Sequence, residues 1–268
     1  MSGSVIHSQS AAMVPAVYSA GQSAQLPVAI DYPAALALRQ MSMVHDELPK
    51  YLLAPEVSAL LHYVPDLRRK MLLATLWNTG ARINEALALT RGDFSLTPPY
   101  PFVQLATLKQ RTEKAARTVG RMPAGQQTHR LVPLSDSWYV SQLQTMVATL
   151  KIPMERRNRR TGRTEKARIW EVTDRTVRTW IGEAVAAAAA DGVTFSVPVT
   201  PHTFRHSYAM HMLYAGIPLK VLQSLMGHKS ISSTEVYTKV FALDVAARHR
   251  VQFAMPESDA VAMLKQLS

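Results

Sequence analysis

The sequence predicts a mainly α-helical domain that carries a small antiparallel β-sheet, an α+β fold. Most of the chain repeats its apolar residues at helical spacing between glycine and proline breaks. Two short segments alternate apolar and polar residues instead, which is typical of paired strands with one covered face. With 268 residues and 47% apolar composition, the chain is long enough to bury a core in one or two domains.

The chain divides into three parts. Residues 1–30 contain no Asp, Glu, Lys or Arg and show no sustained period, so residues 1–48 are expected to form a flexible arm. A short helix over residues 33–48 is compatible with this composition. We expect the main domain at residues 49–240 and a C-terminal helical tail at residues 241–268.

Two helices are predicted at the start of the main domain. Apolar residues recur at helical spacing after Pro55, namely Val57, Leu60, Leu61 and Val64. A second helix is expected over residues 67–78, and Gly80 ends it. Beyond this glycine, Arg82 and Glu85 lie three positions apart on one helical face. From these two residues alone, an ordinary surface ion pair is as good an interpretation as a functional site.

A β-hairpin is predicted in the middle of the main domain. Residues 102–109 alternate apolar and polar side chains, and residues 128–134 form a second strand. Lys109 ends the first strand. The long connection between the strands, residues 110–127, contains Lys114.

The chain is strongly basic, with a net charge of +11 and a pI near 10.0, which argues for a polyanionic partner. Charge alone does not separate DNA from RNA or an anionic membrane, and a merely basic soluble protein remains an alternative. Basic residues are concentrated between Arg156 and Arg168, where we expect a loop that contacts phosphates or is simply solvated. The arginines expected to contact phosphates are Arg156, Arg157, Arg159, Arg160 and Arg163.

The last part of the main domain gathers guanidinium, imidazole and phenol groups. One helix is predicted to carry His202 and Arg205 on one face, and a later helix ends just before His228. A short helix then displays Tyr237. Arginine fits a phosphate, histidine moves protons near neutral pH, and tyrosine is a potential oxygen nucleophile.

The order of these pieces resembles the signature of the tyrosine recombinases, also called phage-type integrases. The pieces are His-x-x-Arg, Leu-Met-Gly-His and Thr-Glu-Val-Tyr-Thr, preceded by a Thr-Gly-x-Arg-x-x-Glu-x-Leu box. The resemblance covers about residues 50–240 and implies the catalytic fold of that family. It further implies that Arg82 and Arg205 hold a scissile phosphate. Tyr237 would attack phosphorus and leave a covalent 3′-phosphotyrosyl ester.

The resemblance also implies roles for three further residues. His202 would exchange protons with the tyrosine hydroxyl, and His228 would hydrogen-bond the phosphate or brace the nucleophile. Lys109 would protonate the leaving 5′ oxygen, with Lys114 as its rival because the connection between the two strands is long. Outside the signature, His206 and His211 are interpreted as structural.

By resemblance, the chain is a site-specific recombinase that acts on double-stranded DNA, as a homotetramer on paired sites, without metal, ATP or another cofactor. It is most similar to the small plasmid resolvases of the family, which implies resolution of plasmid multimers. Two alternatives stay open: a non-enzymatic helix-turn-helix regulator, suggested by residues 216–237, and a type IB topoisomerase that shares the chemistry. His202 and His206 have a zinc-ligand spacing, but the metalloprotease pattern needs a glutamate where Thr203 stands.

The sequence also lacks several features. It contains no cysteine, which excludes a disulfide framework and thiolate metal sites. No apolar run approaches the length of a membrane span, and the N-terminus has no secretory-signal pattern. We therefore expect a cytoplasmic protein.

Overall fold

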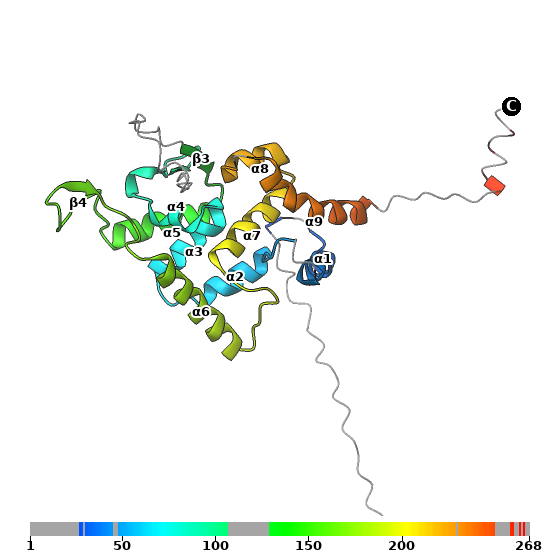
Figure 1. The fold of residues 1–268 in the computed structure, drawn as a ribbon, viewed down its shortest axis with the longest axis horizontal. Helices are drawn as coiled ribbons and strands as arrows, with labels where there is room; N and C mark the ends of the chain where they lie inside the picture. The colour runs from blue at the N-terminus through cyan, green and yellow to red at the C-terminus, as the bar shows by residue number, and fades with distance from the viewer. Residues whose placement is uncertain are drawn as a thin grey trace, which may run out of the picture.

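The computed structural model describes residues 27–28, 30–44, 48–106, 129–228, 230–249, 258–259, 263 and 265. This part of the chain is rich in helices and holds two small antiparallel sheets, so the predicted fold class is confirmed (Figure 1). The helices are α1 Tyr32–Val44, α2 Ala54–His62, α3 Leu67–Thr79, α4 Ile83–Leu87, α5 Ser137–Thr149, α6 Asp174–Ala190, α7 Pro201–Tyr214, α8 Leu219–Met226 and α9 Ser232–His249, with the 3-10 helix η1 Arg91–Asp93. The strands are β1 Phe94–Ser95, β2 Phe102–Ala106, β3 His129–Pro133, β4 Glu155–Arg157 and β5 Thr164–Lys166.

The first hydrophobic core surrounds α3, which begins at a side-chain cap and ends at the glycine expected to stop it. The Asp66 side chain caps its first turn by accepting a hydrogen bond from the Arg69 backbone N–H at 2.8 Å, and Gly80 ends it in the left-handed conformation. Side chains from α2, α5, α6 and the larger sheet pack around the buried face of α3. One residue of α7, Phe204, also belongs to this core.

The larger sheet has the order β1-β2-β3, and all its pairs are antiparallel. Val103 lies opposite Val132, and Leu105 lies opposite Arg130, so the alternation predicted for β2 and β3 is the one observed. Strand β1 was not predicted, because two residues are too few to show an alternating pattern. The stretch 107–128 lies outside the described residues.

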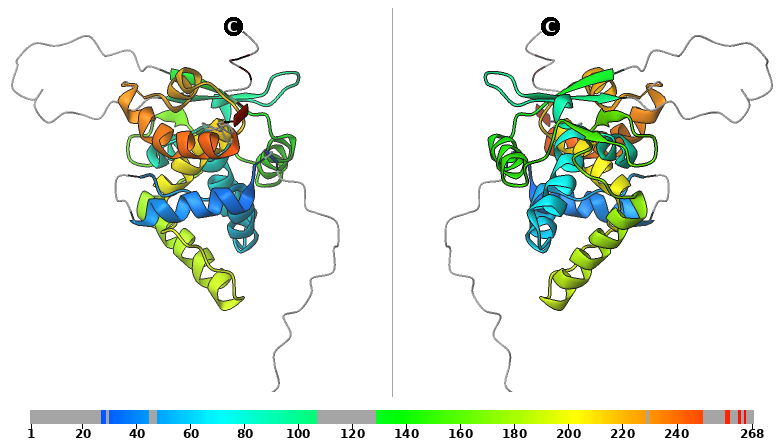
Figure 2. Two further views of the ribbon diagram at one scale, coloured as in Figure 1. Left: turned by 90° about the vertical axis from the view of Figure 1, so that its right-hand side faces the viewer. Right: turned by 90° about the vertical axis from the view of Figure 1, so that its left-hand side faces the viewer.

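The second core lies between α1, α7, α8 and α9. Ala35 of α1, Leu213 of α7, Leu222 of α8 and Val240 of α9 are all buried in it. Figure 2 shows α1, in blue, and α9, in orange, side by side on one face of the molecule. Because α7 contributes to both cores, the first turns of that helix are fixed where the two cores meet.

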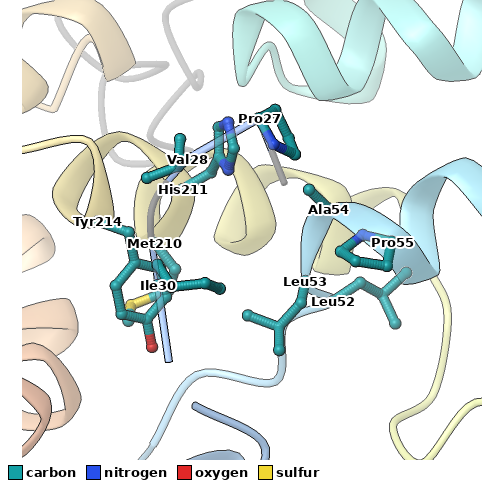
Figure 3. Close-up of a pocket in the computed structure, with 10 residues that line it drawn as sticks. All are labelled: Pro27, Val28, Ile30, Leu52, Leu53, Ala54, Pro55, Met210, His211 and Tyr214. Carbon is teal, nitrogen blue, oxygen red and sulfur yellow. The ribbon is translucent and has the colours of Figure 1, made fainter. Parts of the chain in front are cut away.

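The described part of the N-terminal segment forms α1, the short helix predicted there, and this helix packs on the body of the protein. Arg39 of α1 is 3% exposed, forms an ion pair with Glu56 at the start of α2, and donates to the Ser196 hydroxyl at 2.7 Å. Figure 3 shows the segment before α1 lying against α7 and the residues that precede α2, through Pro27, Val28, Ile30, Leu53, Met210 and Tyr214. Residues 1–26 lie outside the described residues.

Two predictions of local structure were wrong. The basic segment expected as a loop is a β-hairpin in which Arg156 of β4 lies opposite Glu165 of β5. Its strands have three residues each and no apolar alternation, so no strand pattern was visible. The two helices expected around Tyr237 and around residues 243–251 form one continuous helix, α9, that passes through the boundary set at residue 240.

Candidate active site

Arg82 lies at the turn between α3 and α4. Its backbone N–H and its Nη1 both donate to the carboxylate of Glu85, at 2.9 and 3.0 Å. The first of these bonds satisfies a free donor at the N-terminus of α4, which fixes the start of this short helix. The Arg82 side chain remains 45% exposed, so its guanidinium is available to an anion from solvent.

Glu85 is 2% exposed and joins Arg82 to a second arginine that the sequence interpretation missed. Arg130 of β3 donates from Nη2 to Glu85 at 2.6 Å and from Nε to the Leu225 carbonyl at 2.8 Å. Burial alone raises the pKa of Glu85, but the hydrogen bond and charge of Arg130, with those of Arg82, hold it below its ordinary value. The Nη1 of Arg130 is buried and has no hydrogen-bond partner in the described part of the protein.

Arg205 joins three elements that are distant in the sequence. Its side chain projects from α7, donates from Nη1 to the Gly80 carbonyl after α3, and donates from Nη2 to the Met226 carbonyl at the end of α8, at 2.6 Å. Both carbonyls are at helix ends and would otherwise lack partners. Burial, with the charge of Arg82, lowers the pKa of Arg205 to about 10, which still leaves it protonated at neutral pH.

His228 follows the left-handed Gly227 that ends α8. A Cβ on that glycine would lie 2.9 Å from Nη1 of Arg130, so only glycine lets the turn approach so closely. His228 Nδ1 lies 2.8 Å from the Thr234 hydroxyl at the start of α9. Burial, with the charge of Arg205 and Arg82, lowers the pKa of His228 to about 4, so the imidazole is neutral at pH 7.

Tyr237 of α9 is 2% exposed, and its hydroxyl lies 2.9 Å from Nδ1 of His206. Burial raises the pKa of this phenol to about 12, although Arg205 and Arg82 oppose the shift. His206, interpreted above as structural, is therefore the neighbour of the predicted nucleophile. The spacing of four from His202 was the available signal, because it places both imidazoles on one face of a helix.

His202 is exposed in the first turn of α7, where Thr200 caps the helix. Its ring centroid lies 4.3 Å from that of His206. Both imidazoles border a groove of about 320 Å³ between α7, α9 and the segment before α2, which also includes Lys50, Thr200 and Val236. Burial, with the charge of Arg205, lowers the pKa of His202.

The structure brings five of the six predicted catalytic residues into one site. Burial is the main cause of the pKa shift at each of three groups, His202, His228 and Tyr237, and the charges of Arg205 and Arg82 act on all of them. Direct contacts also join these residues: Arg205 donates to the Gly80 carbonyl, two residues before Arg82, and Arg130, the partner of Glu85, lies against Gly227, the residue before His228. The sixth residue, Lys109, and its rival Lys114 lie outside the described residues.

The basic β4–β5 hairpin is separate from this site and stands at the left edge of the view in Figure 1. Arg156 forms ion pairs with Glu165 and Glu171, and Arg157 donates to the Gly162 carbonyl. These two arginines thus brace the hairpin. Three further arginines, at or next to its turn, are exposed and form no ion pair with the described acidic residues: Arg159, Arg160 and Arg163.

The site combines the guanidiniums of Arg82 and Arg205 with the buried phenol of Tyr237 and with neutral imidazoles. It can hold a tetrahedral anion such as a phosphodiester and present a phenol to it. Within the described ranges, no group of three or more His, Asp or Glu could hold a metal ion. None of the helices in the described part of the chain is long and apolar enough to cross a membrane.

Comparison with known proteins identifies similar chains. Residues 50–243 match the Phage integrase family. Over 268 residues, the whole of both chains, the sequence is 97% identical to a protein of Escherichia coli strain K12 named "Resolvase". It is 47% identical over 257 residues to an Escherichia coli protein named "Probable site-specific recombinase in afa region", covering 95% of this chain and 97% of the relative.

A solved structure of the Tn1549 transposon integrase in complex with a circular intermediate DNA has a similar fold. The TM-score is 0.54 at 19% identity, with 82% of this chain and 66% of that chain covered. At this identity the likeness concerns the fold alone. This chain is shorter than that integrase, of which it spans about two thirds.

Proposed function

Because this chain belongs to the phage integrase family, the tyrosine recombinases, which are DNA strand-exchange enzymes, we propose that it cuts and rejoins double-stranded DNA through a covalent 3′-phosphotyrosyl intermediate on Tyr237. The single observation that carries the proposal is the position of this phenol. Its hydroxyl contacts His206, the residue after Arg205, and Arg205 in turn donates to the Gly80 carbonyl, two residues before Arg82. A phosphodiester needs that combination of charge neutralisation and nucleophile.

The proposed cleavage step follows from these residues. Arg82 and Arg205 bind the two non-bridging oxygens of the phosphate, and arginine suits this role because its planar fork donates two bonds. The Tyr237 oxygen attacks phosphorus, the P–O5′ bond breaks, and the strand end becomes an ester of the phenol. His228 donates a hydrogen bond to the phosphate or braces α9 through Thr234.

The leaving 5′ oxygen must gain a proton when the P–O5′ bond breaks. We assign this proton to the lysine of the β2–β3 connection, Lys109 or Lys114. The number of phosphoester bonds does not change in the cleavage step, because the bond to the tyrosine oxygen replaces the P–O5′ bond. A 5′-hydroxyl from a second duplex can therefore attack the phosphotyrosyl ester and restore DNA without ATP. The net result is strand exchange.

Two contacts with partners complete the proposal. The turn of the β4–β5 hairpin contacts phosphates outside the reacting one, because its three exposed arginines lack acidic partners and such contacts need no base sequence. Tyr237 is buried, so the segments that cover it must open before a phosphate reaches the hydroxyl. We assign this opening to assembly of four subunits on two paired sites.

The biological role we infer is resolution of plasmid multimers in the cytoplasm. Its support is the 97% identity, over the full length of both chains, to the Escherichia coli protein named "Resolvase". Resolution is strand exchange between two copies of one site on the same molecule, which is what the proposed chemistry delivers when the two sites are paired.

The test uses a pool of nicked duplexes of random sequence, because a nick next to the cleaved bond releases the 5′ end and traps the covalent ester. Wild type and Tyr237→Phe are incubated with the pool, and protein–DNA adducts that survive denaturation are recovered and sequenced. We expect an adduct with wild type only, enriched in one duplex sequence. Absence of an adduct from wild type would instead fit a non-enzymatic helix-turn-helix regulator.

The recovered sequence separates the two enzymatic alternatives. It is placed twice in a supercoiled plasmid and once in a control plasmid. A recombinase yields recombinant circles from the plasmid with two sites, whereas a type IB topoisomerase relaxes both plasmids and recombines neither.

A further inference from the structure

The hydrogen-bond partner of the Tyr237 hydroxyl is His206, the residue directly after Arg205 in α7. Nδ1 of His206 lies 2.9 Å from the phenol oxygen, and the two rings contact edge to face with centroids 5.5 Å apart. The family resemblance implies that His202 exchanges protons with this hydroxyl, but the His202 ring packs edge to face against His206, with centroids 4.3 Å apart. In the described structure the phenol therefore has an imidazole neighbour that its sequence signature does not include.

We infer that His206 is the base that takes the proton of Tyr237 when the phenol attacks phosphorus, an inference that rests on the function proposed above. In this step the O–H bond of the phenol breaks and an N–H bond forms at Nδ1 of His206. The phenol oxygen bonds to phosphorus, and the P–O5′ bond breaks. The proton gained by the 5′ oxygen is a different one and comes from a separate acid.

The hydrogen bond has the geometry that this transfer requires. A general base must lie within about 2.6–3.2 Å of the oxygen it deprotonates, and Nδ1 of His206 lies 2.9 Å from the phenol oxygen. His206 is neutral, because burial together with nearby positive groups lowers its pKa to about 3. In the tautomer that carries the one proton on Nε2, the ring offers the Nδ1 lone pair to the hydroxyl.

The groups around His206 explain why transfer waits for a phosphate. The ring faces His202 and Arg205 from its own helix, His228 from the turn after α8, and Tyr237 from α9, and Lys50 lies in the same groove. Most of these groups are cations or become cations on protonation, so they oppose a positive charge on His206. A phosphate held by Arg205 and Arg82 supplies negative charge beside them, which raises the pKa of His206 toward the value a base needs.

The proton also has a way out of the site. His206 and His202 both border the groove of about 320 Å³, which opens to solvent beside the exposed His202. A proton accepted at Nδ1 leaves the opposite nitrogen, Nε2, free to release its own proton toward this groove. His202 then acts at the groove and at the phosphate, and the direct contact with the nucleophile belongs to His206.

The test compares two substitutions at position 206 on the duplex recovered from the random pool. His206→Asn places an amide oxygen two bonds from Cβ, as Nδ1 is, so it keeps the hydrogen bond but cannot accept the proton. His206→Phe removes both. His211→Asn is the matched control, because His211 is also a half-buried imidazole of α7 but lies against Trp77, outside the site. The readouts are DNA affinity, the single-turnover rate of adduct formation, and the pH dependence of that rate.

We expect both His206 variants to bind the duplex with unchanged affinity and to form the adduct about 10²-fold more slowly than wild type. The rate for His206→Asn should rise about tenfold for each pH unit, because hydroxide must then remove the proton from a phenol of high pKa, whereas wild type is nearly flat around neutral pH. A structural role would not produce that pH profile. A wild-type rate in His206→Asn would overturn the inference and leave the proposed function standing, and absence of an adduct from wild type would overturn both.

Discussion

Removing the charge of Glu85 should destabilise the whole protein as well as the site. The carboxylate accepts from the Arg82 N–H at 2.9 Å, from Arg82 Nη1 at 3.0 Å and from Arg130 Nη2 at 2.6 Å. The Arg82 side chain is 45% exposed, so solvent screens its share to less than about 1 kcal/mol. The Arg130 side chain is 8% exposed, and a buried charge that loses its partner costs about 3–5 kcal/mol.

Glu85→Gln keeps the shape and one acceptor oxygen, so we expect the lower end of that range, about 3 kcal/mol. The assay is urea unfolding of wild type and variant, with the midpoint shifted and the slope unchanged. Glu183→Gln is the matched control, because Glu183 pairs with Arg69 at 2.8 Å but is 55% exposed, and it should cost less than about 1 kcal/mol. Equal small losses in both variants would refute the reasoning that the buried network holds the site.

The pH dependence gives this prediction a second readout. Because the folded pKa of Glu85 is lowered, its contribution is present above the ordinary value of 4.5 and is lost as the pH falls through the folded value. The free energy of unfolding of wild type should therefore fall more steeply than that of Glu85→Gln below about pH 4.5. Parallel curves in this acid range would contradict the assigned pairing.

Three further predictions concern other parts of the molecule. Gly80→Ala strains a left-handed residue with φ of +58° and places a Cβ 2.3 Å from the Tyr208 ring, so it should destabilise the fold by about 2 kcal/mol or more. Urea unfolding should show a smaller loss for Gly192→Ala, which has φ of +80° but open space around it, and equal losses would count against a clash with Tyr208. Stability should also fall as the pH drops below the ordinary histidine value of 6.5, because burial lowers the pKa of His202, His206, His211 and His228 and only the unfolded chain gains those protons. Urea midpoints at about pH 7.5 and about pH 5.5 measure this, and an unchanged midpoint would contradict it. Finally, the hairpin arginines are replaced together in a triple variant, Arg159→Ala, Arg160→Ala and Arg163→Ala. Its slope of log DNA affinity against log salt concentration should be lower by up to about 0.9 for each phosphate that the hairpin no longer binds. The control Arg175→Ala on α6 should leave this slope unchanged.

Most helices could be predicted because their ends carry local signals. Asp66 and Gly80 bound α3, and Thr200 begins α7, each acting through its own backbone neighbourhood. The packing of α1 on the body of the protein was not predicted, for the opposite reason. This packing comes from a buried ion pair between Arg39 and Glu56, 17 positions apart, which no local pattern shows.

The candidate site shows the same division between local and distant information. The family signature indicated which residues react or bind. It predicted that they lie in one site without predicting their individual contacts, because the signature segments need only come together in the fold. Arg130 and His206 were missed because their roles come from contacts across the fold, with Glu85 45 positions away and with Tyr237 31 positions away. A charged residue at an inward position of β3 was a usable signal for Arg130, since such a residue is buried only when it is paired.

The claim on which the rest depends is that the Tyr237 oxygen, held beside Arg82 and Arg205, becomes the atom that carries the DNA. Protease digestion of the trapped adduct, followed by mass spectrometry, identifies the side chain that bears the nucleotide. We expect the 3′-phosphate on the peptide that contains Tyr237, with loss of the adduct in Tyr237→Phe. A nucleotide attached to any other residue, or an adduct that persists in Tyr237→Phe, would contradict the account.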